Sequence, residues 1–203
     1  MKRALIVIDV QNEYVTGDMP IAYPPLDVSL PNIGAAMDAA TRAGVPVVVV
    51  QHVSPEDSPI FARGSFGVAV HESVAQRASD HTIEKAFPSS FTGTDLAAWL
   101  AEREIDTIAI AGYMTQHCDD STARDAVHRG LAVEFLSDAT GTLDMANEAG
   151  TLTAEDLHNA VLTVMQSGFA AVATTEEWIA AVNGGPELVR SNLIASLSPT
   201  LVG

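Results

Sequence analysis

Short apolar runs rich in β-branched residues recur along the chain, and segments with helical periodicity lie between them. Two of these runs, residues 3–10 and 45–52, are almost continuously aliphatic, which is typical of strands buried on both faces of a sheet. Parallel strands need a long crossover connection, which is usually a helix. The alternation therefore predicts an α/β fold: a doubly wound, six-stranded, mainly parallel sheet with helices on both faces.

The ends of several expected elements carry recognisable signals. Pro31 near the start of a helix and Gly44 at its end are typical helix boundaries, and Thr153 is a typical N-cap. We expect strands over residues 3–10, 45–52, 81–85, 107–113, 131–136 and 169–173. We expect helices over residues 30–44, 68–78, 94–103, 118–129, 154–166 and 175–182. Together they predict one domain over residues 1–185, and an apolar tail, residues 186–203, that either packs on a neighbouring subunit or frays.

The chain is strongly acidic, with 26 Asp and Glu against 10 Lys and Arg and a formal net charge of −16. A field of this sign repels a phosphate backbone, so we expect no nucleic-acid partner. The apolar runs are far shorter than the ~20 residues of a membrane span. Asp9 also interrupts the first run before a signal-peptide core is complete. We therefore expect a cytoplasmic protein with no membrane partner.

Three chemically distinctive residues fall at the carboxyl ends of expected strands, where doubly wound sheets bind their ligands. Asp9 ends the first strand, Lys85 ends the third, and Cys118, the single cysteine, follows the fourth. A thiol that opens a helix has a lowered pKa, and nearby backbone amides stabilise an oxyanion. Asp9 could then accept the thiol proton while Lys85 offsets its charge. Taken singly, the same residues also fit a buried thiol, a loop-capping carboxylate and a surface lysine.

Three segments carry a resemblance that favours the catalytic interpretation. Residues 8–14 (IDVQNEY), 84–96 (EKAFPSSFTGTDL) and 111–126 (AGYMTQHCDDSTARDA) resemble the signature blocks of the isochorismatase-like cysteine hydrolases. That family includes nicotinamidases, carbamoylsarcosine and maleamate amidohydrolases, and streptothricin hydrolase, and the similarity covers residues 3 to about 182.

The resemblance assigns roles to residues of this chain. It implies that Asp9 is the base, Lys85 its cationic partner and Cys118 the nucleophile. It further implies a cis peptide bond between Tyr113 and Met114, and an oxyanion hole formed by the backbone N–H groups of Met114 and Cys118.

The metal ligands of nicotinamidases are missing from the corresponding segment. Nicotinamidases carry an Asp-x-His pair and further histidines after the second strand, whereas residues 50–54 read VQHVS. His52 and His71 remain, but two separated imidazoles without a carboxylate are weak evidence for a metal site. We therefore expect no metal and no cofactor, and the departure also counts against nicotinamide as the substrate.

A second departure follows the cysteine, where relatives usually have an apolar residue and this chain has Asp119 and Asp120. Acidic residues in a first helical turn interact favourably with the helix dipole. Alternatively, one of them faces the pocket and attracts a cationic substrate.

His117, beside the cysteine, is an alternative base that we expect instead in the pocket wall. Phe61 and Phe91 are further pocket candidates, although aromatic residues are more often core. We expect the substrate-binding residues to be Gln11, Tyr14, Phe87, Tyr113, His117 and Asp119.

These observations predict a cysteine hydrolase that cleaves a C–N amide bond of a small molecule through a thioester. The bond belongs to a carboxamide, a ureido group or a lactam, and a cationic lactam of the streptothricin type fits the acidic chain. One alternative is an isochorismate-type vinyl-ether hydrolase, although relatives with that activity generally do not need the cysteine. Another is a non-catalytic module on the same fold. The expected assembly is a homodimer or homotetramer.

Overall fold

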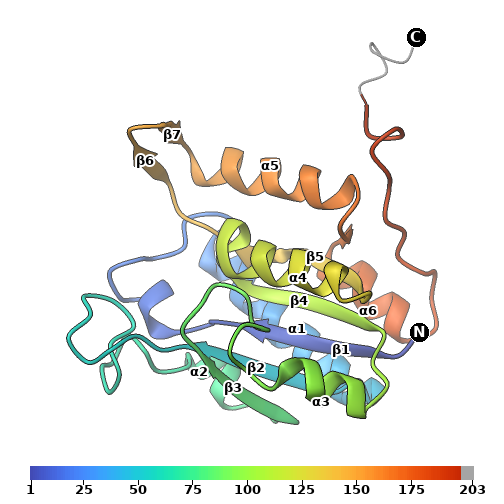
Figure 1. Ribbon diagram of the computed structural model, residues 1–203, viewed down its shortest axis with the longest axis horizontal. Helices are drawn as coiled ribbons and strands as arrows, with labels where there is room; N and C mark the ends of the chain where they lie inside the picture. Colours follow the sequence, from blue (N-terminus) through green and yellow to red (C-terminus); the bar gives the residue numbers. More distant parts are fainter. Residues whose placement is uncertain (198–203) are drawn as a thin grey trace.

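A six-stranded, wholly parallel sheet forms the centre of the computed structural model, which describes residues 1–197 (Figure 1). Its strand order is β3-β2-β1-β4-β5-β8, and every neighbouring pair runs in the same direction. The strands are β1 Arg3–Ile8, β2 Val47–His52, β3 His81–Lys85, β4 Thr107–Tyr113, β5 Ala132–Gly141 and β8 Ala171–Ala173. This confirms the predicted doubly wound α/β fold.

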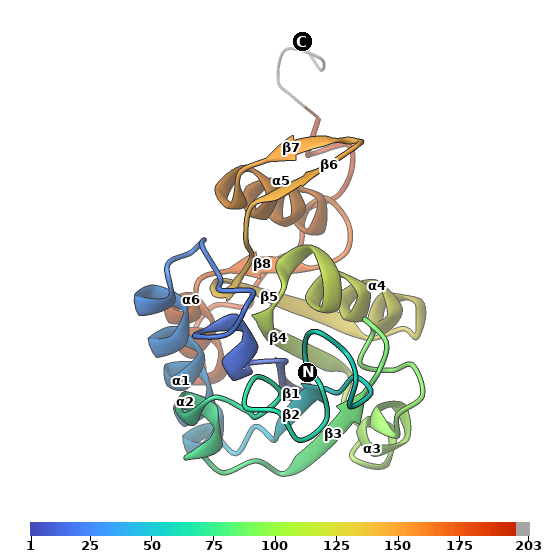
Figure 2. The same cartoon turned by 90° about the vertical axis from the view of Figure 1, so that its left-hand side faces the viewer.

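The near-continuous apolar runs are explained by burial on both faces. Along β1, Leu5 and Val7 enter one core cluster, whereas Ala4, Ile6 and Ile8 enter the other. Helices α1 (Leu26–Ala43) and α6 (Thr175–Val182) cover the first face. Helices α3 (Leu96–Glu102), α4 (Asp120–His128) and α5 (Ala154–Gln166) pack on the second cluster. Figure 2 shows α1 and α6 on one side of the sheet, α3 and α4 on the other, and α5 above β8.

The first helix begins earlier than the sequence signals indicated. It starts at Leu26 rather than residue 30, and Pro31 lies inside it. Proline cannot donate the bond to the carbonyl four residues earlier, which here belongs to Asp27. Asp27 and Pro31 are both exposed, so water can satisfy that carbonyl and the helix continues.

Other elements also have bounds that differ from those predicted from the sequence. Helix α2 is only Glu72–Ala75, instead of residues 68–78, because Val70 forms a bridge with Gln11 and extends the chain before His71. Strand β5 continues to Gly141, beyond the expected end at residue 136. Conversely, β8 begins two residues later than expected. A hairpin of β6 (Met145–Asn147) and β7 (Gly150–Leu152) was not predicted.

The carboxyl ends of the strands form the edge that carries the candidate site. This edge lies at the left of Figure 1, together with η1 (Asn12–Tyr14) and the loop of residues 53–71, and it faces the viewer in Figure 2. After α6, the tail first contacts the body, where the Gln166 amide donates to the Val189 carbonyl at 3.1 Å and Arg190 donates to the Gly168 carbonyl at 2.8 Å. It then extends outward, and its residues 198–203 lie outside the described part of the chain. The single domain over residues 1–185 and the packing of the tail on a neighbour remain predictions.

Within residues 1–197, no helix has the length and apolarity needed to cross a membrane.

Candidate active site

Asp9, Lys85 and Cys118 meet at the carboxyl edge of the sheet. The Lys85 ammonium Nζ lies 2.7 Å from Asp9 Oδ2 and donates a hydrogen bond of 3.2 Å to Cys118 Sγ. The side chains of Asp9 and Lys85 are fully buried, and Cys118 is 7% exposed. The structure therefore brings together the three residues that the sequence singled out.

The strand order explains this convergence. Asp9 directly follows β1, has a positive φ of 51° and donates its N–H to the carbonyl of Val50 at 2.9 Å. Cys118 follows the neighbouring strand β4, whereas Lys85 ends β3 and reaches across the end of β2. Three separate stretches of chain thus deliver a carboxylate, an ammonium and a thiol to one point.

A fourth residue, His52, completes the surroundings of the ammonium. His52 ends β2, and its Nδ1 lies 3.4 Å from Lys85 Nζ. Burial and the charge of Lys85 lower the pKa of His52 although Asp9 opposes them, so the neutral ring can accept at Nδ1. From the sequence, His52 was a weak candidate for a metal ligand and otherwise a loop or pocket residue, with no role toward Lys85. Its position at a strand end was the signal that could have placed it in the site.

The charges in the site favour a neutral thiol in the resting protein. Burial raises the pKa of Cys118, the charge of Asp9 raises it further, and Lys85 only partly opposes them. Burial alone would lower the pKa of Lys85, but the charge of Asp9 and the contacts of the ammonium with Asp9 and the Cys118 sulfur outweigh it and raise that pKa. The expectation that a helix N-terminus lowers the thiol pKa was wrong, because Cys118 lies within a buried π-helical turn, η2 (Thr115–Asp119), ahead of α4.

Asp9 is well placed to receive the thiol proton. Neither of its carboxyl oxygens makes a hydrogen bond of good geometry with the described residues, even though Oδ2 touches the Lys85 ammonium. An acceptor with free lone pairs beside a neutral thiol is the arrangement that a general base requires.

The backbone before Cys118 has the predicted cis peptide bond between Tyr113 and Met114. The Met114 carbonyl accepts hydrogen bonds from the N–H groups of His117 and Asp119, at 2.9 and 3.3 Å. Among residues 1–197, the Met114 N–H itself donates to no backbone carbonyl. This donor is therefore available for an oxyanion, although the hole formed by Met114 and Cys118 stays a prediction.

Two of the expected substrate-binding residues use their polar atoms within the protein. The Gln11 amide donates to the carbonyls of His52 and Val68, at 2.9 and 2.6 Å, and accepts from the His52 N–H at 2.9 Å. Tyr113 is fully buried, with its hydroxyl 2.8 Å from Ser29 Oγ. In this structure both residues hold the walls of the site in place and offer no free polar atom to a ligand.

The remaining expected substrate-binding residues differ in how deeply their side chains are buried. Tyr14 is buried, and its ring packs on Phe61 and Tyr113 with centroid distances of 5.1 and 5.7 Å. Burial and the nearby negative groups raise the pKa of Tyr14, which keeps its hydroxyl neutral. Phe87 is 57% exposed and borders a surface pocket of about 240 Å³ that also contacts Lys85. His117 is exposed beside Cys118.

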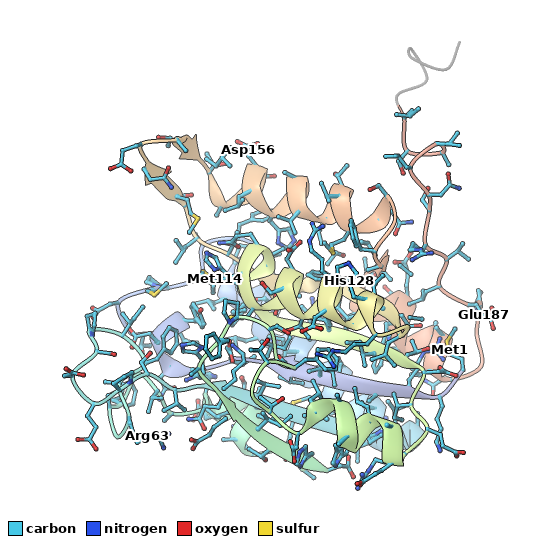
Figure 3. The ribbon with its side chains drawn as sticks, viewed as in Figure 1. Met1, Arg63, Met114, His128, Asp156 and Glu187 are labelled. Carbon is cyan, nitrogen blue, oxygen red and sulfur yellow. The ribbon has the colours of Figure 1, made fainter. Side chains whose placement is uncertain are left out.

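Figure 3 shows the relation of this edge to the rest of the molecule. Met114 lies toward the same side as the loop that carries Arg63, whereas Met1 and His128 lie toward the opposite side. Phe91, considered above as a pocket residue, is instead a core residue at 5% exposure, with the Arg129 guanidinium 4.8 Å from its ring centre.

The two acidic residues after the cysteine have different surroundings. Asp120 forms an ion pair of 2.8 Å with Arg124, one turn later on α4. Asp119 is fully buried, and neither of its oxygens has a hydrogen-bond partner in the part of the chain that the structure describes.

The second histidine considered for a metal site has a local structural role. His71 caps α2, where its Nδ1 accepts a hydrogen bond of 3.2 Å from the Ser73 N–H. The described residues contain no group of three or more His, Cys, Asp or Glu side chains that could hold a metal ion. Independence from metal remains a prediction for activity measurements.

The chain is similar to known proteins over most of its length. Residues 3–177 match the model of the isochorismatase domain. An isochorismatase-like protein from Burkholderia xenovorans LB400, solved by crystallography, is 62% identical with a TM-score of 0.95, covering 96% of this chain and 94% of that one.

Two curated relatives are similar over more than four fifths of the chain. The uncharacterized isochorismatase family protein YddQ of Bacillus subtilis is 32% identical, covering 88% of this chain and 99% of its own length. Nicotinamidase 3 of Arabidopsis thaliana is 29% identical over 82% of each chain. With a family model that spans most of its length and a parallel sheet of the same architecture, the chain belongs to the isochorismatase family of hydrolases.

Proposed function

We propose that this isochorismatase-family hydrolase cleaves a C–N amide bond of a small molecule through a thioester on Cys118. The observation that carries the proposal is the buried contact of Lys85 with both Asp9 and Cys118. Relatives named nicotinamidase, N-carbamoylsarcosine amidase and ureidoacrylate amidohydrolase support the amide as the reacting group.

The first half-reaction forms the acyl-enzyme. As Cys118 Sγ attacks the substrate carbonyl carbon, its proton passes to Asp9, so the neutral thiol becomes nucleophilic only when it reacts. The backbone N–H groups of Met114 and Cys118 hold the developing oxyanion. The C–N bond then breaks, and the amine leaves with the proton that Asp9 had accepted.

The second half-reaction regenerates the thiol. Asp9 removes a proton from water, and the resulting hydroxide attacks the thioester carbonyl. The C–S bond breaks, and the sulfur recovers a proton from Asp9, so that one amide and one water give one acid and one amine. Throughout both steps, Lys85 remains charged and stabilises the negative charge that moves between Asp9 and Cys118.

The test is a hydrolysis screen over carboxamides, ureido compounds and lactams. It monitors amine or ammonia release, and intact-protein mass spectrometry on quenched samples detects an acyl adduct. We expect the wild-type protein to form an adduct on Cys118 and Cys118→Ala to lose both adduct and turnover while remaining folded by circular dichroism.

Two outcomes would contradict the proposal. Turnover retained by Cys118→Ala would exclude covalent catalysis, and isochorismate cleavage without any amide hydrolysis would instead favour a vinyl-ether hydrolase. The absence of turnover across all these substrates would favour a non-catalytic module.

A further inference from the structure

Asp119 is a buried acid that the proposed triad chemistry does not use. Its side chain is fully buried, and both carboxyl oxygens lack a hydrogen-bond partner among residues 1–197. A carboxyl group removed from water without a partner destabilises the fold, and natural proteins rarely keep such a group without a role. This combination makes Asp119 a candidate for an interaction that the isolated chain does not supply.

The helix dipole does not explain this residue. Asp120 lies in the first turn of α4, where an acid favours the helix dipole, and forms an ion pair with Arg124. Asp119 is the last residue of the π-helical turn η2 and the N-cap residue of α4, but it is enclosed and its side chain makes no capping hydrogen bond. The two neighbouring acids therefore need different explanations.

Asp119 lies in the electrostatic environment of the nucleophile. Burial raises its pKa, the charge of Asp9 raises it further, and Lys85 opposes them. The Lys85 ammonium, however, is already in contact with Asp9, Cys118 and His52. Besides Cys118 within η2 itself, titratable groups of other elements act on Asp119 or contact η2: Tyr14, Asp9, Lys85, Tyr113, Asp120 and His158.

We propose that Asp119 binds a cationic nitrogen, such as a primary ammonium group, carried by the amide substrate close to its scissile carbonyl. The inference rests on the proposed amide hydrolysis and names its substrate class. Asp119 directly follows Cys118 in the chain, and its carboxyl group is influenced by Asp9 and Lys85, the two groups that meet beside the Cys118 sulfur. A positively charged N–H donor there would supply the partner that both carboxyl oxygens lack.

Binding of the cation displaces the proton of the Asp119 carboxyl group, so that one positive charge replaces another. Burial and the charge of Asp9 raise the pKa of the enclosed Asp119 carboxyl, which favours its protonated form, with the proton on one oxygen, in the free protein. When the ammonium group approaches, the O–H bond breaks, the proton goes to solvent, and the carboxylate accepts N–H hydrogen bonds from the ligand. A matched neutral amide offers no charge to replace the proton and releases none.

The test uses four simple probes and protein in which Cys118→Ala prevents turnover. Glycinamide and β-alaninamide carry an ammonium group at two distances from the amide, and propionamide and butyramide carry a methyl group in its place. Titration calorimetry in two buffers of different ionisation enthalpy measures the affinity and the number of protons released. We expect at least one cationic probe to bind about tenfold or more tightly than its neutral match, with release of about one proton.

Neighbouring acids provide matched controls in the same protein background. Asp119→Asn should remove both the preference and the proton release, whereas Asp120→Asn removes an equal formal charge and should change neither. The preference should persist in 0.5 M salt, because a long-range field from the net charge would be screened there, with a Debye length of only about 4–5 Å.

The proposal is overturned if cationic and neutral probes bind equally, if none of the four probes binds, or if Asp119→Asn keeps the preference. Its failure is distinguishable from failure of the proposed hydrolysis, because binding is measured without the nucleophile. Cationic amides that bind with proton release but are not hydrolysed by the wild-type protein would overturn the proposed hydrolysis alone.

Discussion

At the scale of single residues, the surroundings of Lys85 strongly restrict which side chain can replace it. Its ammonium group contacts three acceptors of different kinds: a carboxylate oxygen, a sulfur and an imidazole nitrogen. An ammonium carries three N–H donors around one small centre, whereas a guanidinium is planar and larger. Eight of the ten basic residues in the chain are arginine, so the lysine at this position is chemically informative.

Lys85→Arg should therefore lower kcat/KM by about a hundredfold or more despite conserving the charge, because the guanidinium cannot reach all three acceptors in the same buried space. The measurement is steady-state hydrolysis of the best amide from the screen, with circular dichroism to verify folding. Lys2→Arg is the matched control, since Lys2 is exposed and should tolerate the change. Near-normal activity of Lys85→Arg would refute this interpretation of the ammonium.

The surroundings of Asp119 also predict that the free energy of unfolding depends on pH. The pKa of Asp119 is raised in the folded state, so above pH about 4 the unfolded chain loses a proton that the folded chain keeps. The contribution of Asp119 to the free energy of unfolding is therefore favourable below its pKa in the unfolded chain. It is lost progressively as pH rises toward its pKa in the folded protein. Asp119→Asn removes the titration, and its gain in unfolding free energy over wild type should increase with pH, by at most about 1.4 kcal/mol per unit.

Urea unfolding of wild type and Asp119→Asn at pH about 4.5, 6 and 7.5 measures this difference. Asp120→Asn, which removes a surface ion pair instead, should show no such increase. A constant difference between wild type and Asp119→Asn across the three pH values would show that Asp119 ionises normally in the folded protein.

At the scale of secondary-structure elements, prediction from sequence succeeded where local signals were complete. Strands β3 and β4 and helices α5 and α6 have the predicted bounds. Thr153 and Thr174 each accept a hydrogen bond from the N–H three residues later, as N-caps do. Asp9, Lys85 and Cys118 were predictable for a related reason, because the ends of parallel strands share one edge of the sheet.

What could not be predicted depends on partners that are distant in sequence. The polar atoms of Gln11 and Tyr113 are used by Val68 and Ser29, and nothing local indicates these contacts. The π-helical turn around Cys118 similarly follows from how β4 meets α4, and its burial reverses the expected direction of the thiol pKa shift. The β6–β7 hairpin consists of two three-residue strands, too short for a periodic pattern to form.

The junction of β1 and β4 gives a prediction at this scale. Gly112 pairs with Ile8, has a φ of +126°, and a side chain at this position would collide with the Ile8 carbonyl. Gly112→Ala should therefore lower the unfolding free energy by more than about 3 kcal/mol or prevent folding. Gly168→Ala is the control, because the space around Gly168 is open. Equal urea midpoints for the two variants would contradict the close approach of these strands.

At the scale of the whole molecule, a buried polar cluster of Arg3, Glu134 and Trp178 connects the sheet to one helix layer. Arg3 in β1 forms an ion pair of 2.8 Å with Glu134 in β5, and Trp178 of α6 donates its indole N–H to Glu134 at 2.8 Å. The ion-pair side chains are 12% and 3% exposed. Arg3 begins β1, whereas Asp9 follows its end, so this cluster lies away from the candidate site.

Glu134→Gln should consequently destabilise the fold by about 3–5 kcal/mol, because Arg3 is left with an unpaired charge. Hydrolysis per folded molecule should stay within about twofold of wild type, since the proposed triad is untouched. Urea unfolding followed by tryptophan fluorescence, together with activity normalised to folded protein, tests both parts. Glu102→Gln is the control, because its ion pair with Arg103 is exposed. A loss of activity larger than the loss of folded protein would connect this cluster to the site.

The strand order β3-β2-β1-β4 also bears on how the protein reaches its active form. Asp9, Lys85 and Cys118, the proposed triad, come from three distant stretches of chain, and parallel pairing around β1 brings them together. Such pairing closes long loops before any contact compensates for the lost chain entropy, which makes folding slow relative to helix formation. A refolding chain therefore regains helical signal before it regains catalysis, and recovered activity reports completion of the central sheet.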